Sequence, residues 1–478
     1  MADANAHRTL GQGQLAPLRG LMDLLALSDK FAGDAGIVGN DPVIVSPHRL
    51  GEASATAQLL IGVIVAVINQ ERTGQSTDVT IDIIDALHYL HPTNFIQQSG
   101  HAIDVGADRV PINGLFLCRD GRYIMLEAGP PYAKLLNGYL SFFNCANDKT
   151  SFARAVSQWD SESLEEALAD AGVPACRAFT PEEWLKHPQG QILREDPVIE
   201  IEKIGEGEPT PFADANVPAL LAGIRVLDFT HVLAGPRSAR TLAEYGADVL
   251  HVSSPAHADT LAQHLCVNVG KRCTYLDLLA ADELQTMHDL ASEADVFTST
   301  YRPAVNRRFG LLPEQLAAQS KRGIVCMSAN AYGHYGSWRD RPGFDQNGQV
   351  ASGFAAVEGA PGPPRFSPVF YLADLITGYL AAAGMMTALL RRATEGGSYH
   401  VKLSLTRSSM WVHELGLLQP ETLEGLPTGD TYPVNLSTIE TTYGPVTQLA
   451  PALRFSNLMI PPVMNLVPYG SDPATWLA

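Results

Sequence analysis

The chain has 478 residues, with 51 acidic against 33 basic side chains and a formal net charge of −18 at pH 7. Hydrophobic residues make up 46% of it and charged residues 18%, a composition that excludes a disordered chain. The length predicts two domains, or three small ones. The negative charge gives no electrostatic basis for binding nucleic acid or an anionic membrane, so we expect neither as a partner, and a polyanionic ligand would need a local basic pocket.

Residues 1–14 show neither the basic start and apolar stretch of a secretion signal nor the Arg-rich pattern of a transit peptide. The sequence therefore predicts a cytoplasmic protein. The six cysteines form no CxxC pair and show no metal-ligand spacing. We expect reduced thiols and no bound metal.

Two long apolar stretches, residues 53–68 and 372–390, approach the length of a membrane span. The first is short for a span, and the second carries Asp374 near its start. Buried core helices explain both stretches better than a membrane does.

These stretches also belong to an internal repeat. A shift of the sequence by about 322 positions needs no gap, and each copy then has an acid at a helix start, about four apolar turns, a glycine stop and a short alternating strand. The shift places Glu52 over Asp374, Gly74 over Gly396, and residues 79–81 over 401–403. We expect two related pieces in the chain.

After the first copy, residues 115–128 predict a hairpin that turns at Asp120 and Gly121, followed by helical stretches around residues 159–171. The charged, Pro- and Gly-containing run 200–218 is typical of a linker. We therefore expect domains at 1–215 and 216–478.

From residue 224 onward, strands and helices alternate. Strands are predicted at residues 224–229 and 247–252, and further strands near 273–276, 295–298 and 323–327. This βαβ series predicts a parallel sheet, and hence an α/β fold class with a second, smaller α+β domain.

The loop after strand 224–229 contains His231, at the edge where parallel sheets bind ligands. The loop is not a GxGxxG turn, and Ser253 stands where a dinucleotide fold would place an acid, so nicotinamide chemistry is disfavoured. From position alone, His231 is either a ligand contact or a loop histidine that caps backbone groups.

Basic residues cluster at Lys271 and Arg272, at Arg302 beside Tyr301, and at Arg307 and Arg308. Guanidinium and ammonium groups pair with phosphate oxygens, so the clusters could form a phosphate pocket. Composition alone favours solvated surface charges.

Asp374 has two interpretations. An acid that opens an apolar helix is commonly an N-cap, which contributes about 1 kcal/mol. Alternatively, a carboxylate at the positive end of a helix, walled by apolar side chains, is able to attack an activated acyl group. The residues alone leave both open.

Taken together, six ordered motifs resemble the class III CoA-transferase family, which includes formyl-CoA and carnitine CoA-transferases and, as relatives, α-methylacyl-CoA racemases. They are VLDFTHVLAGP (226–236), YGADVLHV (245–252), NVGKRCTYLDL (268–278), YRPAVNRRFGL (301–311), RPGFDQNGQVASG (341–353) and ADLITG (373–378). The repeat extends the resemblance to residues 45–200 through ERTGQSTDVTIDIIDAL, the hairpin and AGVPACRAFTPEEW.

The resemblance implies a Rossmann-like CoA-binding domain, a formyl-CoA transferase-like activity and specific site residues. Asp374 matches the family nucleophile, and His231 lies beside CoA. The matched CoA contacts are Lys271, Arg272, Tyr301, Arg302 and Arg308, and no metal is involved.

The implied reaction moves CoA from an acyl-CoA to a small carboxylic acid through an aspartyl anhydride and an aspartyl-CoA thioester. Family members form homodimers of two interlocked chains. This chain would preserve that topology or mimic it internally.

The chain departs from the family in the order of its parts. Residues 1–215 lack a nucleotide-binding half of their own, and they would supply the small domain that the second segment lacks. Glu52 occupies the nucleophile position of the first copy, where we expect a structural role. One rival function is racemisation, which is disfavoured because Phe344 stands where racemases carry a proton-accepting histidine. Another is a non-catalytic CoA-binding paralogue.

Overall fold

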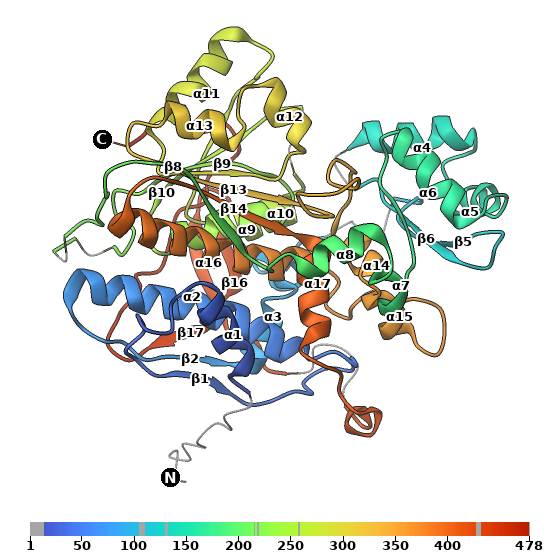
Figure 1. The fold of residues 1–478 in the computed structure, drawn as a ribbon, viewed down its shortest axis with the longest axis horizontal. Coiled ribbons are helices and arrows are strands. Elements are labelled where there is room, and N and C mark those ends of the chain that lie inside the picture. Colours follow the sequence, from blue (N-terminus) through green and yellow to red (C-terminus); the bar gives the residue numbers. More distant parts are fainter. Residues whose placement is uncertain are drawn as a thin grey trace.

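A computed structural model of the chain describes residues 14–104, 110–129, 132–214, 216–217, 219–256, 259–426 and 432–477. Its centre is a seven-stranded sheet with the order β11-β10-β9-β12-β13-β14-β8 (Figure 1). The strands are β8 (Glu200–Gly205), β9 (Arg225–Phe229), β10 (Asp248–Ser253), β11 (Arg272–Tyr275), β12 (Val296–Ser299), β13 (Val325–Asn330) and β14 (Ser398–Ser404). All neighbours in this sheet pair in parallel except β8, which runs antiparallel to β14. The predicted parallel sheet and the α/β class are confirmed.

Helices cover both faces of this sheet, because its strands are apolar on both sides. One face packs side chains of β9 and β10 against α11 (Ala281–Glu293) and α13 (Pro313–Gln319). The other face packs against α9 (Ala234–Glu244) and α16 (Leu372–Glu395). The remaining helices of this part are α10 (Leu261–Val267), α12 (Pro303–Arg308), α14 (Asp345–Ala351), α15 (Phe354–Gly359) and α17 (Leu405–Glu414).

The first copy of the repeat forms α1 (Ala16–Leu24), α2 (Leu50–Thr73), α3 (Ile83–His88) and a three-stranded sheet. That sheet joins β1 (Ala35–Val38) and β2 (Val79–Asp82) to β17 (Leu453–Phe455), which arrives from the other end of the chain. Helices α2 and α16 are both 24 residues long and start at the two positions that the 322-residue shift aligns. They lie side by side in one core (Figure 1), which confirms the repeat.

Both repeat helices are long and apolar enough to cross a membrane, but the apolar window of each is entirely buried inside the protein. They are the central helices of the core, as the sequence predicts. All six cysteines are free thiols.

The smaller α+β domain pairs β5 (Gly114–Leu117), β6 (Tyr123–Leu126) and β7 (Ala175–Arg177) in an antiparallel sheet. The predicted hairpin is confirmed, since β5 and β6 flank the turn at Asp120 and Gly121, where glycine takes a φ of 79°. The sheet packs against α4 (Ala133–Phe143), α5 (Lys149–Val156) and α6 (Ser161–Asp170) around a separate apolar core. Two short helices, α7 (Pro181–Trp184) and α8 (Pro188–Glu195), lead back to the large sheet.

A four-stranded antiparallel sheet combines β3 (Gln97–Gln98) and β4 (His101–Ala102) with β15 (Leu436–Thr441) and β16 (Gly444–Leu449). Two 3-10 helices, η1 (Pro92–Phe95) and η3 (Pro420–Leu423), complete the elements of the described residues.

The run predicted as a linker is partly a strand. Residues 200–205 form β8 at the edge of the large sheet, where Lys402 of β14 bonds Glu200 at 3.0 Å and Glu202 at 2.5 Å. These ion pairs hold Glu200 and Glu202 in the strand, although their charges, taken from the sequence alone, favour a solvent-exposed linker. Because β8 joins the second segment's sheet and β17 joins the first segment's, strands cross the predicted 215/216 boundary in both directions, and the boundary itself stays a prediction.

Candidate active site

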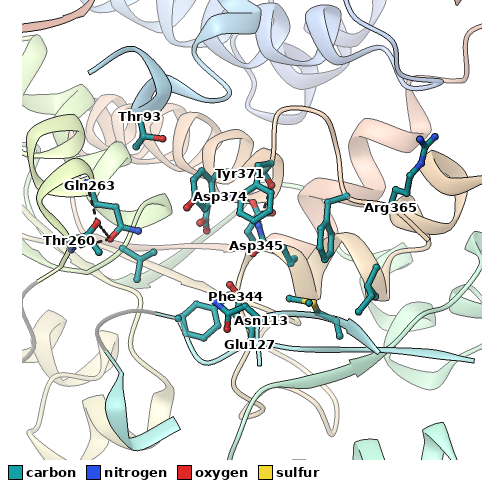
Figure 2. Close-up of a pocket in the computed structure, with 18 of the residues that line it drawn as sticks. Thr93, Asn113, Glu127, Thr260, Gln263, Phe344, Asp345, Arg365, Tyr371 and Asp374 are labelled. Atoms are coloured by element: carbon teal, nitrogen blue, oxygen red, sulfur yellow. Dashed lines mark hydrogen bonds between the residues drawn. The ribbon is translucent and has the colours of Figure 1, made fainter. Parts of the chain in front are cut away.

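Asp374 lines a cavity of about 500 Å³ that is formed by both segments of the chain. From the small domain come Asn113, Met125 and Glu127, and from the second segment come Asp345 and Asp374. Figure 2 shows Asp374, Asp345 and Glu127 around the same space, with Thr260 and Gln263 on one side and Arg365 on the other. The carboxyl group is therefore open to a cavity, although Asp374 is only 7% exposed.

The structure separates the two interpretations of Asp374. The N-cap residue of α16 is Tyr371, and Asp374 lies three residues later, in the first turn of the helix. Its backbone N–H donates to Oδ2 of Asp345 at 2.7 Å, so a carboxylate from α14 serves the helix start. Because Asp345 takes the capping role, the Asp374 side chain is not used as the cap.

Three carboxyl groups share this cavity, and burial raises the pKa of each. The pKa of Asp374 is raised well above its usual value by burial and by the charge of Asp345. Burial also raises the pKa of Asp345 to about 7 and that of Glu127 well above its usual value, the latter assisted by the charges of Asp345 and Asp374. Burial and mutual repulsion therefore disfavour the state in which all three groups are ionised together.

Glu127 is held in place by a neighbour of Asp345. With the Gln346 amide oriented to satisfy both of its atoms, its nitrogen donates to Oε1 and Oε2 of Glu127 at 3.1 and 3.2 Å. Asp345 and Glu127 both lie within motifs of the sequence, but the motifs alone predicted no role for either residue. The GFDQ segment contains Asp345 and Gln346, so the sequence offers these residues as candidates. Their contacts with α16 and with Glu127 of the small domain arise only in the folded chain.

The first copy repeats the same helix-start geometry. The backbone N–H of Glu52 donates to Oδ2 of Asp41 at 2.7 Å, as Asp374 does to Asp345, and burial raises the pKa of Asp41 to about 6. Here, however, Nη1 of Arg49 lies 3.3 Å from both oxygens of Glu52, and Glu52 lines a different cavity. A carboxylate paired in this way is a poor nucleophile, which agrees with the expected structural role of Glu52.

His231 lies in the loop after β9, at the predicted edge of the sheet. Its ring is 4.6 Å from that of Tyr301, and its Nδ1 forms a close hydrogen bond with the Tyr132 hydroxyl. Tyr132 in turn stacks on Phe344, with ring centroids 5.8 Å apart. A row of aromatic rings thus leads from the sheet edge into the carboxyl cavity.

The loop is strained at the next residue. Val232 has a φ of 68°, in the left-handed region that a β-branched side chain strongly disfavours. Its N–H donates to Oδ2 of Asp259 at 2.9 Å, and Val232 lines the cavity. Strain of this kind, roughly 1–3 kcal/mol, persists where the surroundings fix a functional loop.

Arg302 and Arg308 stand at the two ends of α12, which follows β12, and both are exposed. Arg308 also covers the ring of Phe309 at 5.4 Å. The structure therefore brings His231 and Tyr301 together at this edge of the sheet, where α12 begins after Arg302, and leaves Arg302 and Arg308 exposed.

Lys271 and Arg272 are both engaged in ion pairs within the protein, and their role as CoA contacts stays a prediction. The Lys271 side chain is fully buried, and its Nζ donates to Asp228 at 2.7 Å and to the Pro236 carbonyl at 2.8 Å. Arg272 pairs with Asp248 at 3.0 Å. Phosphate binding by Lys271 would require its buried ammonium group to leave Asp228.

Within the described ranges, no group of three or more His, Cys, Asp or Glu residues is arranged to hold a metal ion. The cavity itself presents carboxyl groups, a helix N-terminus and aromatic rings.

Comparison with known proteins identifies the family. The sequence model of CoA-transferase family III matches residues 11–211 and again residues 221–442. The chain belongs to CoA-transferase family III, and the two matches correspond to its two related segments.

Among curated proteins, the chain is similar to an acetyl-coenzyme A transferase of Hypoxylon pulicicidum, with 35% identity over 207 residues, which cover 42% of this chain and 35% of the relative. An acyl-CoA transferase of Gibberella moniliformis is 31% identical over 268 residues, covering 53% of this chain and 47% of the relative. The chain thus spans less than half the length of these two relatives. Among solved structures, a CAIB/BAIF family protein from Brucella suis is 25% identical and covers 47% of this chain and 64% of that one, with a TM-score of 0.36.

Proposed function

We propose that the protein transfers CoA between an acyl-CoA thioester and a carboxylic acid, with Asp374 as the nucleophile. The observation that carries the proposal is that the Asp374 carboxyl faces a cavity from the first turn of a buried helix while another carboxylate, Asp345, serves the helix start. Family membership and the names of the relatives support the same reaction class. A formyl-CoA transferase-like subtype stays a prediction.

In the proposed mechanism, an oxygen of Asp374 attacks the thioester carbonyl carbon, and the C–S bond breaks to release CoA thiolate and leave an acyl-aspartyl anhydride. The thiolate then attacks the aspartyl carbonyl, which releases the acyl group as a carboxylate and forms an aspartyl-CoA thioester. An oxygen of the acceptor carboxylate attacks the aspartyl carbonyl of this thioester, and the C–S bond breaks to release CoA thiolate and leave an acceptor-aspartyl anhydride. The thiolate then attacks the acceptor's acyl carbonyl, which forms the new acyl-CoA and releases the Asp374 carboxylate. Each step exchanges one nucleophile for another, so no net proton is consumed.

The surroundings of Asp374 suit this chemistry. The first turn of α16 presents backbone N–H groups and a positive dipole end to negative charge that develops on the reacting carbonyl. Apolar side chains around the cavity keep water from an anhydride that it would hydrolyse. In this proposal Arg302 and Arg308, which are exposed, pair with the phosphates of CoA, and Tyr301 and His231 contact its less charged parts.

Racemisation fits the site less well. Phe344 lines the cavity and stacks on Tyr132, and a phenyl ring accepts no proton. The non-catalytic alternative is decided by direct trapping of the intermediate.

The test is incubation with an acyl-CoA and hydroxylamine, followed by peptide mass spectrometry. We expect an adduct or hydroxamate on Asp374, in the peptide that contains α16. An adduct on Glu127 or Asp345, or transfer without any aspartyl adduct, would refute Asp374 as the nucleophile. CoA binding without turnover of any donor would establish the non-catalytic paralogue.

The pH dependence of transfer follows from the raised pKa of Asp374. The nucleophile gains its charge only as pH rises, so kcat/KM is expected to fall on the acid side well above the usual aspartate pKa of about 4. In Asp345→Asn the neighbouring charge is lost, so the pKa of Asp374 drops and the acid limb moves to lower pH. A pH–rate profile of both proteins measures the shift. An acid limb that stays in place, or moves to higher pH, would disprove the coupling.

Arg308→Ala is expected to weaken CoA binding about tenfold, because a charge-assisted contact to phosphate is lost. Isothermal titration with CoA, 3'-dephospho-CoA and pantetheine locates the contact, since pantetheine binding would then be unaffected. Arg307→Ala, an exposed neighbour on the same helix, is the matched control. Equal losses for all three ligands would place Arg308 away from the phosphates.

Homodimer formation and a cytoplasmic location stay predictions. The cavity already combines the small domain of the first segment with the helix of the second, so one chain provides residues from both sides of its own site.

A further inference from the structure

One wall of the cavity is apolar. Met125 is 2% exposed and packs in one core cluster with the partly buried Leu115 and Phe366. Phe370 meets Phe366 edge to face, with ring centroids 6.0 Å apart, and Pro364 completes the lining on this side. We refer to these five residues as the apolar wall.

The charged groups of the cavity are mainly acidic. Glu127, Asp345 and Asp374 line it, and the only cations among its described lining residues are Lys149 and Arg365. Both cations are exposed.

Arg365 is not turned to the reacting carboxyl groups. Nε and Nη2 of Arg365 donate to the carbonyl of Glu358 at 3.2 and 2.7 Å, and Figure 2 shows the guanidinium directed away from Asp374. Lys149 is the first residue of α5, directly after the helix cap Asp148, and is exposed.

These features discriminate between classes of acyl group. A second carboxylate at the far end of a bound acyl chain would lose its hydration against the apolar wall, with no buried cation to pair with it. It would also be repelled by whichever cavity carboxyl is ionised. Each methylene group that is buried, by contrast, raises the affinity of the site for the acyl-CoA about fourfold.

We infer that the acyl groups exchanged at this site are those of apolar monocarboxylic acids and that dicarboxylic acids are rejected. This inference rests on the proposed function, in which Asp374 exchanges acyl groups, and it adds the substrate class. The apolar wall determines the specificity.

The experiment compares donors of equal chain length: butyryl-CoA with succinyl-CoA, and valeryl-CoA with glutaryl-CoA, each with acetate as acceptor. We expect kcat/KM to rise about fourfold per methylene from propionyl-CoA to butyryl-CoA. The dicarboxylic donor of each pair is expected to react at least about 100-fold more slowly than its partner. A succinyl-CoA rate equal to or above that of butyryl-CoA would overturn the inference and leave the proposed function intact.

Binding tests the preference apart from catalysis. With Asp374→Asn, which lacks the nucleophile, dissociation constants of the same four thioesters are expected to follow the same order. Equal affinities within a pair would refute the inference even if no donor is turned over. Failure of every donor to form an aspartyl adduct in the native protein would instead refute the proposed function.

Two substitutions test the wall itself. Phe366→Arg, at a partly buried position, places a cation in the wall and is expected to raise the succinyl-to-butyryl ratio at least about tenfold, whereas Phe366→Leu should keep it. Met125→Arg provides a second site for the same change. Lys149→Gln and Arg365→Gln should leave the ratio unchanged, and a loss of succinyl transfer in either would show that a rim cation binds dicarboxylates.

Discussion

Replacing Asp374 with asparagine is expected to abolish CoA transfer, by at least about 10⁴-fold in kcat, as removal of a covalent nucleophile does in other enzymes. The amide has the shape of the carboxyl group but cannot attack a thioester. The fold should be retained, because the helix start depends on the backbone N–H of Asp374 and on Asp345, both of which remain. A coupled assay of acyl-CoA formation measures the loss, and circular dichroism and CoA titration verify that folding and binding persist.

The internal repeat supplies the matched control. Glu52→Gln makes the equivalent change at the start of α2, outside the candidate site, and is expected to leave kcat within about twofold. Undiminished transfer by Asp374→Asn, or an equal loss in Glu52→Gln, would eliminate Asp374 as the specific acyl carrier.

Replacing Lys271 with methionine is expected to destabilise the protein by about 3–5 kcal/mol, as breaking a buried ion pair does elsewhere. The Lys271 and Asp228 side chains are both fully buried, and Asp228 also bonds His251, Thr230 and Thr298. Although burial alone would raise the pKa of Asp228, the charges of Lys271 and His251 hold it well below its usual value. Methionine would leave this carboxylate with too little positive charge. Urea unfolding measures the change.

The result also decides what Lys271 does. A structural lysine, when lost, lowers stability but leaves the CoA affinity of the folded protein unchanged. A phosphate ligand, when lost, weakens CoA binding at nearly constant stability. Lys321→Met removes an exposed lysine paired with Glu293 and should change the unfolding free energy by less than about 0.5 kcal/mol.

The hydrophobic periodicity of the sequence predicted the main helices and strands of the fold correctly. The helices α2 and α16, the parallel strands and the hairpin at Asp120 each follow from local patterns, because their side chains repeat with the period of the element. Strands β8 and β17 do not, since each is stabilised by a partner far away in the sequence. The charged residues of β8 favour solvent until Lys402 is placed beside them.

The candidate site likewise contains residues whose positions the sequence predicted and residues whose positions it did not. The positions of His231, Tyr301 and Arg302 at the sheet edge follow from the sequence, because Tyr301 and Arg302 come after β12 and His231 comes after β9. The position of Asp374 at a helix start follows from the apolar period of α16, and the roles of all four residues stay predictions. Lys271 instead precedes β11, so it lies at the amino end of that strand, and its side chain reaches into the protein to Asp228. Asp345 and Glu127 could not be assigned, because their roles depend on contacts with α16 that only the folded chain creates.

The placement of β17 in the first segment's sheet constrains how a newly made chain matures. Residues 35–82 emerge early from the ribosome, but their third strand is synthesised hundreds of residues later. Until then α2, apolar along nearly its whole length, has neither that strand nor α16 to shield it. During synthesis the apolar surface of α2 therefore stays exposed for a long interval and is prone to aggregation. We expect the yield of soluble protein to depend on how much chaperone is available during translation.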